Sequence, residues 1–214
     1  MNHILNDFDR VLNDLAVSIQ TDISPIIQPN KSEGGYFGVP RMVFCYVDFL
    51  GLLYCGWIKK YKNEQKQNFA TSRKAIKFIR EILGRIDRLY KTNGGLLYDM
   101  YRHGTIHIYS PKKLKSKKFP DRTIEWLLYK GDRERWDYYE NRATKFHHLK
   151  IINWANNRFL LPVSINVLYA DLIESMVLYR SIVHNDKSGK LLKNFRTVAE
   201  ALNNDFDSTP YKFW

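Results

Sequence analysis

Residues 42–58 have the sequence MVFCYVDFLGLLYCGWI, the one stretch of the chain apolar enough to be considered as a membrane span. It is shorter than the roughly 20 residues that a span needs. Asp48 near its middle would also cost about 2.5 to 3.5 kcal/mol to insert into a bilayer. We therefore interpret the stretch as a buried core helix of a protein without a membrane span, beginning near Pro40 and ending near Tyr61.

Amphipathic patterns around this helix predict a mainly α-helical bundle of about six helices. Apolar residues recur every three or four positions in the segments 4–19, 76–90, 96–109, 168–183 and 191–202. Ser-Pro at 24–25 is expected to end the first helix, and Asn-Gly-Gly at 93–95 to end the helix before 96–109. Pro162 is expected to open the helix over 168–183, and Ser188 to cap the last one.

Residues 111–160 have a different pattern. The runs IEWLLYK and KFHHLKII are short, aromatic and β-branched, and a charged middle separates them. Such runs are typical of strands, so we expect a small β-hairpin-like insertion. At this length a single domain spanning 1–214 is expected, with the insertion at about 111–160.

The composition excludes several classes of protein. The 214 residues are 44% hydrophobic and include 11 glycines and 2 cysteines, which argues against collagen-like, disulfide-stapled and wholly disordered chains. Cys45 and Cys55 would lie on different faces of one helix, so we expect no disulfide and a reducing, cytoplasmic location. The net charge of +12 favours polyanionic partners such as nucleic acid or an acidic membrane surface.

The segment YRHGTIHIY at 101–109 contains the residues that point to a function. Cleavage of RNA without a metal needs a base for the 2′-hydroxyl proton, an acid for the leaving oxygen and a cation beside the phosphorane. Histidine titrates near neutral pH and can be acid or base, which suits His103 and His107. Arg102 stays charged and grips phosphate oxygens.

Arg102, four intervening residues, His107, one residue and Tyr109 resemble the signature of HEPN ribonucleases, in particular the toxin branch of HEPN toxin and nucleotidyltransferase antitoxin pairs. The resemblance implies a helical fold with Arg102 and His107 as the catalytic pair and His103 as an auxiliary polar group. It implies that Tyr109 is the tyrosine that the toxin branch modifies by nucleotide transfer. A homodimer, an antitoxin or inhibitor protein as partner, and a role in toxin-antitoxin or antiviral defence follow from the same resemblance.

The spacing of the motif raises a geometric question. Residues five apart on a regular helix differ by about 140° in direction, so Arg102 and His107 would not share a face. A local break at Gly104 would bring them together. A two-fold dimer, in which each protomer contributes one arginine and one histidine, would do the same.

Two alternatives for the motif remain open. In the first it is structural, with Tyr101, Ile106 and Ile108 in the core and Arg102 paired to an acid. In the second, a helical face formed by Asp99, His103 and His107 binds zinc, with His147 and His148 approaching from the insertion.

A run of lysines follows the motif and is expected to bind RNA phosphates; it consists of Lys112, Lys113, Lys115, Lys117 and Lys118. A solvated loop is the alternative. Nearby aromatic residues could stack unpaired bases or lie in the core; they are Phe119, Trp126, Tyr129, Trp136, Tyr138 and Tyr139.

Arg180 and His184 form a second basic pair, four residues apart on one helical face. They could complete a site within one chain. Alternatively they are structural, with Arg180 neutralising Glu174 or Asp171 and His184 favoured by the C-terminus of its helix.

Together these features predict a metal-independent endoribonuclease without a cofactor, cleaving single-stranded or loop RNA. The alternatives are a non-catalytic helical domain that binds nucleic acid or a partner protein through a basic face, and a zinc-dependent hydrolase.

Overall fold

The computed structural model of the chain describes residues 2–27, 34–56, 67–108 and 111–205. Its helices are α1 (Asn2–Ile27), α2 (Gly38–Cys55), α3 (Gln67–Phe78), the π-helix η2 (Ile79–Leu83), α4 (Gly84–Ile86), α5 (Leu89–Ile108), α6 (Ile165–His184) and α7 (Lys190–Asp205). Its strands are β1 (Leu114–Lys115), β2 (Thr123–Tyr129), β3 (Glu134–Tyr139), β4 (Arg142–His147), β5 (Ile152–Ala155) and β6 (Arg158–Ser164).

The fold mixes helices with sheets, so the prediction of a mainly α-helical bundle with a hairpin insertion is wrong. Among the described residues, six strands accompany the helices. The strands form a four-stranded sheet in the order β1-β2-β6-β5 and a separate hairpin of β3 and β4. The region expected to hold one small hairpin therefore contributes a sheet as well.

Strand β6 explains the error. Pro162, which was expected to open a helix, lies inside β6 opposite Leu127 of β2. The two strands are parallel, and residues 160–164 of β6 are buried. A continuous apolar run is typical of a parallel strand covered on both faces, and it lacks the alternation that marks a half-exposed strand. Helix α6 begins after it, where the Ser164 side chain accepts a hydrogen bond from the Val167 N–H at 3.3 Å.

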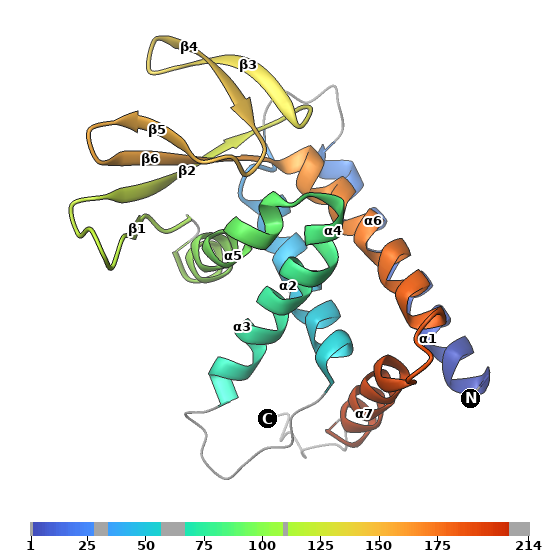
Figure 1. Cartoon of the computed structure of the whole chain (residues 1–214). Coiled ribbons are helices and arrows are strands. Elements are labelled where there is room, and N and C mark those ends of the chain that lie inside the picture. Colours follow the sequence, from blue (N-terminus) through green and yellow to red (C-terminus); the bar gives the residue numbers. More distant parts are fainter. Residues whose placement is uncertain (1, 28–33, 57–66, 109–110, 206–214) are drawn as a thin grey trace, which may run out of the picture.

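Figure 1 shows the strands gathered at one end of the molecule, with the hairpin β3–β4 lying over the four-stranded sheet. The rings of Tyr139 on β3 and Trp154 on β5 lie 5.1 Å apart. Glu140 in the hairpin turn accepts a hydrogen bond from the indole Nε1 of Trp154 at 2.7 Å. Glu140 and Asn141 have φ values of 47° and 64°, as a two-residue turn of type I′ requires.

Helix α2 is a core helix, as the sequence predicts. It packs against α1, α3, α5, α6 and α7, and Val43, Val47 and Leu50 are among its buried side chains. By length and composition alone it would also suit a membrane span, but a core helix has the same composition. It crosses α3 closely, because a Cβ on Gly51 would lie 2.8 Å from the Cα of Ala75. It ends at Cys55, and residues 57–66 lie outside the described part of the chain.

Two predicted helix boundaries are corrected by packing. Helix α1 continues through Pro25 to Ile27, because Ile23 and Ile27 extend its buried face.

Helix α5 begins at Leu89, whose N–H donates to the Asp87 side chain at 2.9 Å, and it runs through residues 93–95 without ending. A Cβ on Gly94 would lie 2.5 Å from the Cγ2 of Ile79, so this glycine lets α5 approach η2. The glycines predicted to end a helix are therefore packing positions inside one.

Candidate functional site

Arg102 on α5 is ion-paired with Asp48 on α2. The Nε of Arg102 donates to Oδ2 of Asp48, and the hydroxyl of Tyr98, one turn earlier on α5, donates to Oδ1 at 2.6 Å. The side chain of Arg102 is 27% exposed and that of Asp48 13%. One carboxylate thus holds the guanidinium at a partly exposed position.

The charge states of this cluster follow from its contacts. Burial lowers the pKa of Arg102, but the hydrogen bond and charge of Asp48 outweigh burial and leave that pKa raised. Burial and the hydrogen bond to Asp48 raise the pKa of Tyr98. Arg102 therefore stays a cation and Tyr98 a neutral hydrogen-bond donor at physiological pH. A fixed cation is what stabilisation of a phosphorane needs.

Sequence reasoning weighed Asp48 only as a cost to membrane insertion and did not identify it as the partner of Arg102. The two residues are 54 positions apart, so no local spacing links them. The available signal was the acid itself, a single carboxylate in an apolar helix, which requires a buried partner.

The remaining residues of the predicted catalytic set lie beyond what the structure describes. His103 and His107 fall within α5, but their side chains are outside the described residues, as is Tyr109 altogether. Helix α5 is continuous to Ile108, so the break expected at Gly104 is absent. Positions 102 and 107 therefore differ by about 140° around one helix. Of the break at Gly104 and the two-fold dimer, the two-fold dimer is the one that would bring positions 102 and 107 together.

The predicted phosphate-binding lysines are all exposed: Lys112, Lys113, Lys115, Lys117 and Lys118. Lys113 forms an ion pair with Glu125 at 2.7 Å. Glu125 also binds Arg158 at 3.0 Å. Arg122 follows the run as a further cation, and its guanidinium lies 4.2 Å from the ring centre of Phe119. The run therefore leaves exposed positive charge at the β1 edge of the sheet.

The aromatic residues divide between the two roles expected for them. Trp136 and Tyr138 lie two residues apart on β3, so their side chains share one face of the hairpin, where they are 69% and 78% exposed. Tyr129 is buried, Tyr139 packs on Trp154, and Trp126 packs on Phe37 at 5.3 Å between ring centres. Base stacking thus remains a hypothesis for the exposed face of the hairpin, together with Phe119, which is 40% exposed.

A buried polar network that sequence reasoning missed connects the sheet to the helices. Its centre is the Tyr90 hydroxyl, which donates to Asp171 at 2.8 Å and lies 3.0 Å from Nε2 of His148. The Nδ1 of His148 lies 3.0 Å from the Ser164 N–H, which must donate to it. Nε2 of His148 therefore carries the proton and donates to Tyr90. Arg133 completes the network by binding Asp171 at 2.7 Å.

This network weakens the zinc hypothesis at one point. Both ring nitrogens of His148 are in hydrogen bonds and its side chain is fully buried, so it is not available as a ligand. Burial lowers its pKa well below the usual value. Asp99 is exposed, and the side chains of the other two proposed ligands, His103 and His107, lie outside the described residues.

The pair Arg180 and His184 joins α6 to α1 through Asp9. The Nε2 of His184 lies 3.0 Å from the Asp9 carboxylate and the Nε of Arg180 lies 3.2 Å from it. Asp171, one acid proposed for Arg180, binds Arg133 instead. The structural alternative therefore fits this pair, with a different acid.

Comparison of the chain with protein-family models, curated proteins and solved structures finds no match. The resemblance to HEPN ribonucleases accordingly depends on the motif at 101–109 alone.

Proposed function

We propose that this protein is a metal-independent endoribonuclease of HEPN type that cleaves single-stranded or loop RNA. The observation that carries the proposal is the Arg102–Asp48 pair. It keeps the arginine of the motif charged and fixed while leaving part of its side chain exposed. The structural alternative also expects Arg102 paired to an acid and Tyr101 in the core, and both are found. What favours the proposal is that the paired guanidinium belongs to a side chain that is 27% exposed and so within reach of a substrate.

In the proposed reaction, one histidine takes the proton of a 2′-hydroxyl and the resulting 2′-oxygen attacks the adjacent phosphorus. Arg102 stabilises the phosphorane, and an imidazolium then protonates the 5′-oxygen as its bond to phosphorus breaks. The products are a 2′,3′-cyclic phosphate and a 5′-hydroxyl. His107 is the acid/base residue, with His103 and Tyr109 positioning it or the substrate.

A homodimer is part of the proposal, because α5 is a continuous helix. A two-fold axis beside α5 would bring Arg102 of one protomer near His107 of the other and supply the second imidazole. An inhibitory partner protein and a role in defence are proposed from the resemblance of the motif alone.

The test is incubation of RNA with the purified protein in excess chelator, with His107→Ala and Arg102→Gln as variants. His3→Ala is a matched control, because His3 is 90% exposed. We expect cleavage by the wild type and the control and none by the two variants. Cleavage that chelator abolishes would contradict the proposal and support the zinc hydrolase.

A non-catalytic nucleic-acid-binding domain is the second candidate. The exposed Trp136 and Tyr138, two residues apart on β3, favour it, because exposed aromatic side chains can stack the bases of single-stranded nucleic acid. RNA binding without cleavage by the wild type would select this candidate.

A further inference from the structure

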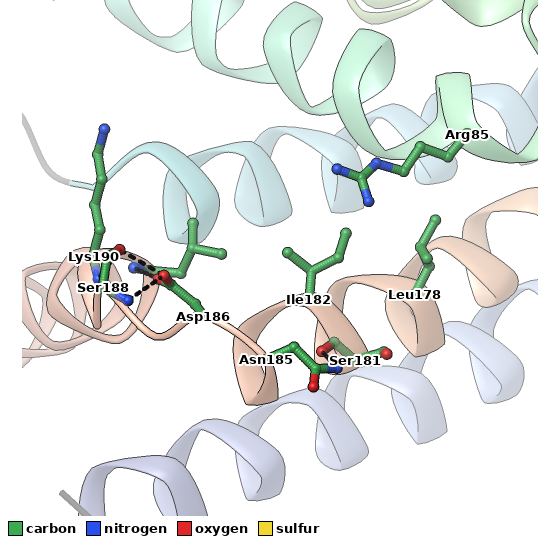
Figure 2. A pocket seen from close by; sticks show the side chains of 9 residues that line it. Arg85, Leu178, Ser181, Ile182, Asn185, Asp186, Ser188 and Lys190 are labelled. Atoms are coloured by element: carbon green, nitrogen blue, oxygen red, sulfur yellow. Dashed lines mark hydrogen bonds between the residues drawn. The ribbon is translucent and has the colours of Figure 1, made fainter.

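Two surface hollows meet at Arg85 on α4. The first, of about 480 Å³, lies between α4 and the corner that joins α6 to α7. Figure 2 shows Arg85 and Lys190 at opposite ends of this hollow, with Ile182 between them. The second, of about 430 Å³, lies between α2, η2, α4 and the start of α5. Because Arg85 lines both, the hollows are neighbours along one groove.

The groove is lined by four exposed cations, Lys190, Arg85, Lys91 and Arg80. Within the part of the chain that the structure describes, none of the four forms an ion pair with a carboxylate. Their charge is therefore not balanced by a neighbouring acid, whereas Arg133 and Arg102 are each ion-paired.

The two acids that line the groove are occupied by other donors. Asp186 accepts hydrogen bonds from the Leu191 N–H at 2.8 Å and from the Ser188 hydroxyl at 2.5 Å, at the start of α7. Glu81 accepts the hydroxyl of Tyr54 at 2.7 Å. These acids reduce the positive potential of the groove without cancelling it, since four cations face two carboxylates.

Arg102 lies outside both hollows, because Tyr98, on the α5 stripe between Lys91 and Arg102, is buried. Lys91, Gly95 and Arg102 fall within about 40° of each other around α5, and Lys91 and Arg102 are about 16 Å apart along it. A Cβ on Gly95 would lie 3.2 Å from the guanidinium of Arg80, so Arg80 lies over α5 between them. The exposed Asp99 is the one acid beside this stripe on the described side chains of α5.

We infer that this groove binds the phosphodiester backbone of single-stranded RNA, as a surface separate from the proposed site at Arg102. The inference rests on the proposed function, because it names a surface that holds that enzyme's substrate. A row of unpaired cations binds successive phosphates without reading sequence. The groove is separate from the lysine run at the β1 edge.

The test measures binding, so it does not depend on cleavage. A fluorescent single-stranded RNA with 2′-O-methyl groups cannot be cleaved by 2′-hydroxyl attack, and its anisotropy reports affinity across a series of salt concentrations. The variant Arg85→Gln/Lys190→Gln removes two groove cations. The control Lys145→Gln/Lys150→Gln removes the same charge from the hairpin side, where both lysines are exposed.

We expect the groove variant to bind several-fold more weakly, with a salt dependence of log K reduced by about 0.7 for each cation removed. The control should stay close to the wild type. Affinity should also rise with oligonucleotide length. Equal losses in both variants, or inorganic phosphate competing as well as the oligonucleotide, would overturn the inference. Groove binding without any cleavage of ordinary RNA would instead defeat the proposed function alone.

Discussion

Replacing Asp48 by Asn removes the charge that holds Arg102 while changing the shape of the side chain little. The amide oxygen of Asn can still accept the Tyr98 hydroxyl, which lies 2.6 Å from Oδ1. The amide nitrogen would instead face Nε of Arg102, so that two donors meet where a donor and a carboxylate met. The substitution therefore removes one charge-assisted bond and leaves the guanidinium without a counter-charge.

The expected cost follows from the exposure of the pair. A hydrogen bond between charged groups contributes about 1.5 to 3 kcal/mol. Arg102 is 27% exposed, so water compensates for part of the loss. We expect Asp48→Asn to lower the free energy of unfolding by about 1 to 2 kcal/mol, measured by urea denaturation. Asp7→Asn, which weakens the more exposed pairs with Arg10 and His3, should cost less than about 0.5 kcal/mol.

The same variant tests the positioning of Arg102. We expect the kcat for RNA cleavage to fall by about tenfold to a hundredfold, because a loosened guanidinium no longer meets the phosphorane in one geometry. RNA affinity should change little, and Asp48→Glu should recover part of the rate. The reasoning is refuted if Asp48→Asn matches the wild type in both stability and kcat while Arg102→Gln is inactive.

Three further predictions concern the fold. Burial lowers the pKa of His148 in the folded protein, so below about pH 6.5 the unfolded chain takes up a proton there that the folded protein excludes. The contribution of His148 to the free energy of unfolding should be full above about pH 6.5 and fall by about 1.4 kcal/mol per pH unit below it. His148→Gln should flatten this dependence in urea titrations. Gly51→Ala should cost about 1 to 3 kcal/mol, because the new Cβ would meet the backbone of Ala75 at 2.8 Å, whereas Gly38→Ala, with nothing within 4 Å, should not lower the melting temperature. Ser164→Ala should cost about 0.5 to 2 kcal/mol in thermal unfolding, because it removes the side-chain cap of α6 and the hydrogen bond that the Ser164 hydroxyl donates to the Gly131 carbonyl at 2.6 Å; an unchanged melting temperature would show that neither contributes.

The helices of the chain were largely predictable, because each helix buries one face and apolar residues therefore recur every three or four positions in its sequence. The stripe of Phe8, Leu12 and Ile19 is buried, as the pattern of α1 indicates. The sheet was not predictable, because β2 pairs in parallel with β6, a strand at 158–164 that is distant in the sequence. No local pattern records that partner, and Pro162 imitates the start of a helix.

The motif proposes Arg102 from local spacing, and its catalytic role stays a prediction. Its surroundings were not predictable, because Asp48 reaches Arg102 only through the packing of α2 on α5. The groove cations illustrate the same limit. Arg80, Lys91 and Lys190 belong to separate elements, and their common surface arises when those elements fold together.

Mass spectrometry of the RNA fragments formed in excess chelator tests the proposed chemistry at its products. The proposed reaction predicts fragments that end in a 2′,3′-cyclic phosphate and begin with a 5′-hydroxyl, formed by the wild type and not by His107→Ala. Fragments with a 3′-hydroxyl and a 5′-phosphate, or cyclic ends that His107→Ala produces equally well, would contradict it.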